Sequence, residues 1–235
     1  MTDILRLPTA GTGARTLRRG WLCMLALLLA GVGGASFLID LPVARSIRSV
    51  PLPGDLRRLL DFPEVAAHGL GVACLIVAVA ALDPTLWRRE AGAAWLPKPD
   101  LVRFIGATYA GSMAVNLLKA SIIRVRPRAI DLAGLDSVAD TFGAVAAAAS
   151  GARGTDLMSF ASGHSAVAAG FAAALSSRYP HATWFFVLVA IAAMAQRITS
   201  SAHYPSDVFC GAALGLLGAA VCLGAPPRST RPFNP

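Results

Sequence analysis

The chain has 235 residues, of which 55% are hydrophobic and only 14% are charged, against about 25% charged in an ordinary soluble domain. Its 21 basic and 13 acidic residues give a formal net charge of +8. The basic residues form no long stripe with interleaved aromatics, so no nucleic-acid partner is expected. Membrane lipids with anionic headgroups and a phosphorylated ligand are the partners that this charge favours.

The apolar residues come in blocks close to the length that crosses a bilayer. A transmembrane helix needs roughly 20 mostly apolar residues, because about 30 Å of hydrocarbon is crossed at 1.5 Å per residue. The blocks show almost no polar face, which argues against a soluble helical bundle. We therefore predict an all-α, polytopic membrane helical bundle with about six transmembrane helices. The expected spans are residues 21–39, 65–82, 101–123, 162–177 (the shortest and richest in alanine), 182–198 and 206–223.

Three parts are expected along the chain: a polar N-terminal leader (1–20), a six-span membrane domain (21–224) and a C-terminal tail (225–235). Basic residues precede the first apolar block, as in a secretory signal. The apolar run continues to residue 39, however, which favours an uncleaved anchor.

Two segments between the blocks fall on the same side of the predicted bundle. Residues 40–64 are expected to form an outer loop with an amphipathic turn. Residues 128–158 form the longest loop, and loops of this length are commonly functional lids or disordered. With the N-terminus inside, eleven Lys and Arg fall on inner segments and ten on outer segments. Three of the outer cations, Lys119, Arg126 and Arg197, are assigned below to a site. Without them the basic residues show a mild bias toward the inner side.

Two cations stand near the carboxyl end of the third block. Lys119 and Arg126 are seven residues apart, so a continuing helix would place both on one face. Pro127 then ends that helix. A cation costs on the order of 2.5–3.5 kcal/mol at the bilayer centre, whereas at the interface it meets anions. The neighbouring Arg124 and Arg128 are interpreted as anchors that reach to the interface.

The tripeptide Ser162-Gly163-His164 opens the fourth block. Serine is a good helix N-cap, and glycine lets the backbone approach a ligand closely. Free N–H groups at a helix start bind anions, and a histidine there exchanges protons near neutral pH. Taken alone, the tripeptide also fits a simple cap with an interfacial histidine.

The most specific pattern follows the fifth block. Arg197 ends this block, His203 comes six residues later, and Asp207 comes four residues after His203. Pro205 is suited to the first position of the sixth helix, which puts Asp207 in its first turn. From there the carboxylate is expected to reach one ring nitrogen of His203 and to leave the other as a nucleophile or base.

No chemical role is expected for the other histidines and the cysteines. His68 falls in the second block and is interpreted as a packed polar residue, and His181 lies in a solvated turn. No His or Cys cluster has the spacing of a zinc site, so we expect neither a metal nor a cofactor. Four cysteines lie in apolar blocks and are interpreted as buried hydrophobes without disulfides: Cys23, Cys74, Cys210 and Cys222.

In this order, the patterns resemble the three signature motifs of the type-2 phosphatidic acid phosphatase superfamily. They are Lys119-x6-Arg126-Pro127, Ser162-Gly163-His164 and Arg197-x5-His203-x3-Asp207. The resemblance covers somewhat over a third of the chain. It implies a helical membrane fold with six spans and a metal-independent phosphatase that acts on a phosphomonoester or pyrophosphate of a lipid.

The resemblance also implies a role for each motif residue. His203, held by Asp207, would attack phosphorus and form a phosphohistidine, and His164 would protonate the leaving alkoxide. Water would then release phosphate. The phosphate oxygens would be bound by Lys119, Arg126, Arg197, Ser162 and the Gly163 amide.

Two positions depart from the family pattern. Ala161 stands where a proline is usual, and Gln196 stands where a serine is usual. Neither position supplies the proton-transfer chemistry. We expect Ala161 to loosen the turn that carries His164, and Gln196 to remove one phosphate hydrogen bond.

Several alternatives stay open at this point. A lipid phosphotransferase would use the same machinery with a second lipid in place of water. A non-catalytic phospholipid-binding membrane protein is disfavoured by the presence of both histidines and Asp207, and a transporter by charges gathered at one face. Vanadate-dependent haloperoxidases share the pocket motifs but are soluble. The motifs do not choose among polyprenyl pyrophosphate, phosphatidate, phosphatidylglycerophosphate and the phosphates of lipid A, and nothing indicates the oligomeric state. The expected location is a bacterial inner membrane, with the site on the periplasmic or outer face.

Overall fold

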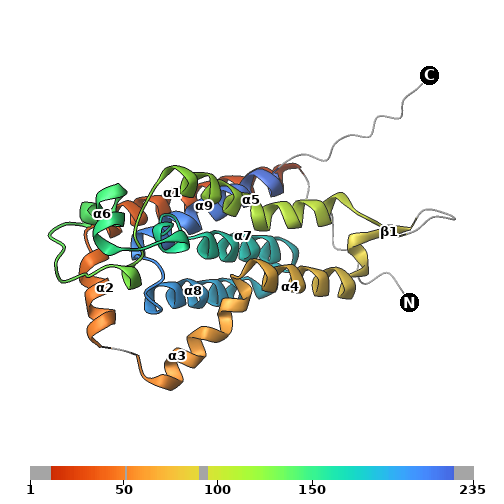
Figure 1. Ribbon diagram of the computed structural model, residues 1–235. Coiled ribbons are helices and arrows are strands. Elements are labelled where there is room, and N and C mark those ends of the chain that lie inside the picture. The colour runs from red at the N-terminus through yellow and green to blue at the C-terminus, as the bar shows by residue number, and fades with distance from the viewer. Residues whose placement is uncertain (1–11, 51, 90–94, 225–235) are drawn as a thin grey trace.

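The computed structural model describes residues 12–50, 52–89 and 95–224, which form an elongated helical bundle (Figure 1). Six helices run along its length in alternating directions, which confirms the predicted all-α bundle. They are α1 (Thr12–Ser36), α4 (Gly69–Leu82), α5 (Pro99–Ser121), α7 (Gly163–Arg178), α8 (Thr183–Thr199) and α9 (Pro205–Gly224). Residues 12–20 of the predicted leader belong to α1, whereas residues 1–11 and the tail 225–235 lie outside the described residues.

The six helices are not equally suited to cross a membrane. Within the described residues, α1, α5, α8 and α9 are each long and apolar enough. The 14-residue α4 passes only together with the preceding segment Gly54–Ala66, from which it is bent by 63°. The 16-residue α7 extends only about 24 Å at 1.5 Å per residue. By length and composition, four helices of the described residues qualify as membrane spans, or five if the bent pair is one span, and α7 is short, as its block predicted.

Helix α9 holds the bundle together by packing against α1, α5 and α7. Its glycines make this approach possible, because small residues let two helix backbones come close in a membrane bundle. A Cβ atom at Gly211 would collide with the carbonyl oxygen of Ser162, and one at Gly215 with that of Ala166. The start of α7 is thereby seated directly on the first turns of α9.

The long loop is an ordered cap over one end of the bundle, so the disordered alternative is wrong. It contains η3 (Pro127–Ala129), η4 (Val138–Thr141), α6 (Gly143–Ser150) and η5 (Gly154–Leu157). The extended chain after α5 lies between two cap segments: Arg124 N–H donates to the Leu157 carbonyl (3.0 Å), and Val125 N–H to that of Thr141 (2.9 Å). Buried Ile130, Leu132 and Ala146 form part of its core.

The predicted outer loop at 40–64 also folds, into α2 (Asp40–Ser49), α3 (Gly54–Asp61) and η1 (Phe62–Ala66). Arg45 binds α2 to the cap by donating to the carbonyl oxygens of Leu132 (2.9 Å) and Leu135 (2.6 Å). Helix α3 projects sideways from the bundle in Figure 1, and α3 and η1 both contact α8.

The opposite end of the bundle is closed by η2 (Pro84–Leu86), a hairpin and η6 (Pro180–Ala182). The hairpin pairs β1 (Trp87–Arg89) with β2 (Trp95–Pro97) in antiparallel register. Helix α9 ends beside the start of α1, since a Cβ atom at Gly224 would touch the side chain of Arg19. The cap and the residues described next therefore lie at the end away from the start of α1.

Candidate active site

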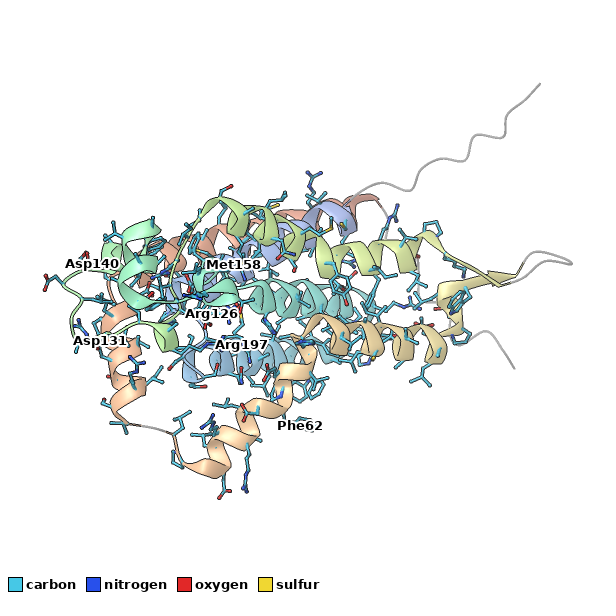
Figure 2. All side chains as sticks on the ribbon, in the orientation of Figure 1. Phe62, Arg126, Asp131, Asp140, Met158 and Arg197 are labelled. Carbon is cyan, nitrogen blue, oxygen red and sulfur yellow. The ribbon has the colours of Figure 1, made fainter. Side chains whose placement is uncertain are left out.

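The predicted site residues come from six segments and gather under the cap. Lys119 lies in the last turn of α5, Arg197 in the last turn of α8, and His164 in the first turn of α7. His203 lies in the turn before α9, and Asp207 in the first turn of α9. Arg126 and Arg197 are seen beneath the cap in Figure 2. The ionisable neighbours of His164 are Arg197, His203, His68 and Lys119.

Lys119 and Arg126 do not share a helix face, which corrects the first motif's expected geometry. Helix α5 ends at Ser121, and the chain is already extended at Ile122. The reason is tertiary: Arg126 N–H donates to the Asp156 carbonyl (2.8 Å), so this stretch pairs with the cap instead of continuing as helix.

The guanidinium of Arg126 is poorly compensated. Its Nε atom is buried and has no hydrogen-bond partner. Burial lowers the pKa of Arg126, and the neighbouring Arg128 lowers it further, which shows that the environment disfavours its charge. A buried polar group without a partner costs free energy. An anion placed against Arg126 would recover that cost.

Ser162 is the N-cap of α7, as predicted. Its Oγ atom accepts hydrogen bonds from the Ser165 N–H (3.3 Å) and hydroxyl (2.9 Å). The Ser162 N–H donates to the backbone carbonyl of Asp207 (2.9 Å), and Ala161 is fully buried. The turn that carries His164 is therefore held by α9 with alanine at position 161.

The imidazole of His203 is almost completely buried. Its Nδ1 atom lies 3.7 Å from Oδ2 of Asp207, which is within ion-pair range but longer than a hydrogen bond, and Nδ1 has no hydrogen-bond partner. Burial lowers the pKa of His203, while the carboxylate of Asp207 opposes this shift. The predicted pairing of His203 with Asp207 is thus present, in a loose form.

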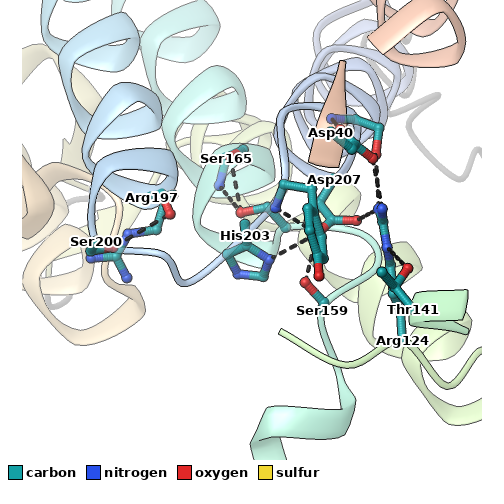
Figure 3. Close-up of polar contacts among 12 residues, drawn as sticks. Asp40, Arg124, Thr141, Ser159, Ser165, Arg197, Ser200, His203 and Asp207 are labelled. Atoms are coloured by element: carbon teal, nitrogen blue, oxygen red, sulfur yellow. Dashed lines mark hydrogen bonds and ion pairs between the residues drawn. The ribbon is translucent and has the colours of Figure 1, made fainter. Parts of the chain in front are cut away.

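The carboxylate of Asp207 is fully buried and bound on both oxygens (Figure 3). Oδ1 accepts from Nη1 of Arg124 at 2.5 Å. Oδ2 accepts from the Ser159 hydroxyl at 2.6 Å and from the Tyr204 N–H at 3.0 Å. These three donors, together with the neighbouring His203 ring, fix the orientation of the carboxylate.

Arg124 was predicted to be an interface anchor, and this prediction is wrong. Its side chain has no exposed surface. Nη2 donates to Oδ2 of Asp40 at 2.6 Å, and Nη1 also donates to the Ser206 hydroxyl at 2.8 Å. Asp40, Ser206 and Asp207 lie more than 80 positions away along the chain, so no local pattern could have indicated these partners. Arg128 does reach the surface, where it pairs with Asp156 at 2.7 Å.

Gln196 replaces the family's serine with a different set of contacts. Its amide oxygen accepts from Arg197, and its amide nitrogen donates to Asp61 (2.9 Å) and Glu64 (3.1 Å). Glu64 also pairs directly with Arg197 at 2.6 Å. This position therefore ties Arg197 to the segment after α3, which the sequence did not reveal.

His68 is the second histidine whose interpretation changes. It precedes α4 as the N-cap residue instead of lying inside a span, and it is exposed. Its ring centroid lies 5.6 Å from that of His164. His181 is exposed in the turn at the other end, as expected. The cysteines, all in described segments, form no disulfide, but their expected burial is wrong: Cys74 is exposed and the other three are half-buried.

Comparison with known proteins identifies the family of the chain. The family model of the PAP2 superfamily matches residues 100–231, which include all eight predicted site residues. The chain belongs to the PAP2 superfamily. This confirms the resemblance drawn from the three motifs, and no solved structure is significantly similar to the chain.

Two curated relatives of this PAP2 protein carry the name Lipid A 1-phosphatase. The one from Rhizobium johnstonii is 36% identical over 112 residues, which cover 48% of this chain and 41% of the relative. The one from Rhizobium etli is 29% identical over 198 residues, which cover 83% of this chain and 80% of the relative. The chain thus spans less than half of the first relative and four fifths of the second.

Proposed function

We propose that this protein is an integral membrane phosphatase that hydrolyses a phosphomonoester or pyrophosphate of a lipid through a phosphohistidine intermediate. The observation that carries the proposal is the buried His203 ring, backed by Asp207, within a group of three cations and a second histidine. The unpartnered Nε of Arg126 supports an anion at this place.

The reaction would proceed in two displacement steps. With Nδ1 turned toward Asp207, Nε2 of His203 attacks phosphorus, and the bond from phosphorus to the lipid oxygen breaks. His164 gives its proton to that oxygen as general acid. Water then attacks the phosphohistidine, His164 takes a proton from the water, and the P–N bond breaks to release phosphate and free His203.

Charge stabilisation would come from Lys119, Arg126 and Arg197. Phosphoryl transfer depends mainly on positioning and on neutralising the equatorial oxygens, and hydrogen bonds to charged groups contribute roughly 1.5–3 kcal/mol each. The described residues contain no group of three His, Cys, Asp or Glu suited to hold a metal ion. We propose a reaction that needs no metal, as the resemblance of the three motifs implies.

The relatives named Lipid A 1-phosphatase make a lipid A phosphate the first substrate to test. Polyprenyl pyrophosphate, phosphatidate and phosphatidylglycerophosphate are the other candidates. We place the protein in a bacterial inner membrane with its site on the periplasmic or outer face. The mild inside bias of basic residues and the site's distance from the start of α1 support this orientation.

The deciding test is phosphate release from a panel of these lipids by detergent-solubilised protein in the presence of EDTA, with His203→Ala as the blank. Release that survives chelation and disappears in the variant supports the proposal. Transfer of phosphate to an added acceptor lipid, without free phosphate, would favour a phosphotransferase. No phosphate leaving any lipid would favour a binding protein.

A further inference from the structure

Three fully buried charged groups lie in a row behind the proposed nucleophile. Asp40, Arg124 and Asp207 each have no exposed surface. Burying charges is expensive, and it is tolerated only when partners and hydrogen bonds compensate them well. Arg124 is not one of the motif residues, and the reaction steps above give it no part. Its position therefore needs a separate explanation.

The guanidinium of Arg124 uses each nitrogen for a different segment. Nη1 binds Asp207 of α9 (2.5 Å), Nη2 binds Asp40 at the start of α2 (2.6 Å), and Nε donates to the Thr141 hydroxyl of the cap (3.2 Å). Figure 3 shows Arg124 between the two carboxylates. Only a planar fork makes these bonds together, and the single ammonium of lysine does not.

Aromatic rings enclose the same guanidinium. Its Cζ atom lies 4.1 Å from the ring centroid of Tyr204, 4.6 Å from that of Phe142 and 5.3 Å from that of Phe37. Rings at these distances attract a cation and exclude water from it. The fork is therefore fixed in direction as well as in position.

We propose that Arg124 is a positioning residue for the reaction, held in place by Asp40; this rests on the function proposed above. By binding Oδ1 of Asp207, Arg124 fixes the carboxylate plane. Oδ2 then stays where the Ser159 hydroxyl and the Tyr204 N–H hold it, facing Nδ1 of His203. His203 thereby keeps its tautomer and its direction toward the phosphate.

A purely structural role would also make Arg124 sensitive to substitution, because Arg124→Gln leaves two buried carboxylates without a cation. The double variant Arg124→Gln/Asp40→Asn separates the two roles. It removes one positive and one negative charge, so the buried net charge equals that of the wild type. Removing one partner of a buried ion pair is strongly destabilising because it leaves an uncompensated charge, and the double variant avoids that change in buried net charge.

The measurement is kcat and KM for phosphate release, per monodisperse protein from size-exclusion chromatography. In the double variant we expect kcat to fall roughly 10- to 100-fold, the effect of outer partners on the groups they orient. We expect KM to stay within about threefold, because a group that acts on the nucleophile changes kcat more than binding. Arg124→Lys, which keeps the cation but lacks the fork, should also lower kcat.

The matched control is Arg128→Gln, four positions along the chain, where the arginine pairs with Asp156 at the surface. Its kcat should equal that of the wild type. Wild-type kcat in either the double variant or Arg124→Lys would overturn the proposal and leave Arg124 as a structural residue. If the proposed function itself is wrong, the wild-type protein will release no phosphate. That outcome is distinct from a variant that keeps the wild-type kcat.

Discussion

Both ends of the bundle carry an aspartate bound to an arginine, but they differ in the buried donors that lack a partner: among the described residues, the end away from the cap leaves the Ser176 hydroxyl, whereas the end under the cap leaves side-chain nitrogens of an arginine and a histidine. At the end away from the cap, Asp83 accepts from Nε of Arg178 (2.8 Å), from the Tyr179 hydroxyl (3.0 Å) and from Thr85. Under the cap, the buried Nε of Arg126 and Nδ1 of His203 have no hydrogen-bond partner. A carboxylate that accepts several hydrogen bonds, as Asp83 does, is typical of a structural contact. Buried donors without a partner are typical of a site where a ligand binds.

The two ends also differ in the charge that their main ionisable groups, Asp83 and His203, carry at neutral pH. Burial would raise the pKa of Asp83, but its bonds from Thr85, Arg178 and Tyr179 lower it below the ordinary value of 3.8. Burial lowers the pKa of His203 against the effect of Asp207. At neutral pH, Asp83 is therefore a charged carboxylate, and His203 is a neutral imidazole that can attack phosphorus.

Of the single substitutions, His203→Ala should reduce the activity of the site most. We expect turnover to fall by at least about 10⁴-fold, since loss of a covalent nucleophile leaves only binding and charge stabilisation. Phosphate release measures the effect, and His181→Ala, in the turn at the other end, is the control. Turnover in His203→Ala close to that of the wild type would mean that the nucleophile is assigned wrongly.

His164→Ala should have the next largest effect, a loss of about 10²- to 10⁴-fold on a lipid alkyl phosphate, as expected for a general acid. An aryl phosphate, whose leaving group needs little protonation, should lose much less. His68→Ala is the matched control, because its ring neighbours that of His164. Equal losses on both substrates would contradict a general-acid role for His164.

The pH dependence should follow from the buried imidazole. Because burial lowers the pKa of His203, the acid limb of kcat/KM should lie below the ordinary histidine value of about 6.5. Asp207 raises this pKa, whereas Arg126 and Lys119 lower it. Asp207→Asn should therefore move the limb to lower pH while reducing kcat. A limb that moves to higher pH would exclude His203 as its source.

Asp83→Asn should have the smallest effect and should touch stability alone. We expect it to lower the free energy of unfolding by about 1 kcal/mol, a typical net value for a lost hydrogen-bonded contact, with kcat unchanged. The lowered pKa of Asp83 means that its contribution is present above pH 3.8 and is lost as the pH falls through the folded-state pKa. Thermal unfolding in detergent should therefore show the two proteins converging in acid. A loss of kcat in Asp83→Asn would contradict the purely structural interpretation.

Much of the fold was predictable because local sequence specifies it. Runs of apolar residues predict helices wherever they occur, so all six helices were found close to their predicted positions. Helix α7 differs from the other long helices because its 16 residues are fewer than the roughly 20 that cross a bilayer. Ten of its 16 residues are buried, and packing on α5, α8 and α9 stabilises it, which the apolar composition of a single block does not show.

The site was predictable only where residues lie close together along the chain. His203 and Asp207 are four positions apart, so helix geometry alone brought the imidazole near the carboxylate. The same reasoning was wrong for Lys119 and Arg126, because the chain pairs with the cap and α5 ends before Arg126. Gln196 was noted as a departure, but its partner Glu64 comes from a segment far along the chain.

The helical membrane class, the order of the three motifs and the superfamily could all be inferred from the amino-acid sequence. Each of these depends on composition or short spacing, which are properties of the chain alone. Only the tertiary structure decided that Arg124 is buried between Asp40 and Asp207, and that His68 faces His164. Whether a charge is compensated or exposed depends on which distant segments pack around it, and that is settled only when the helices assemble.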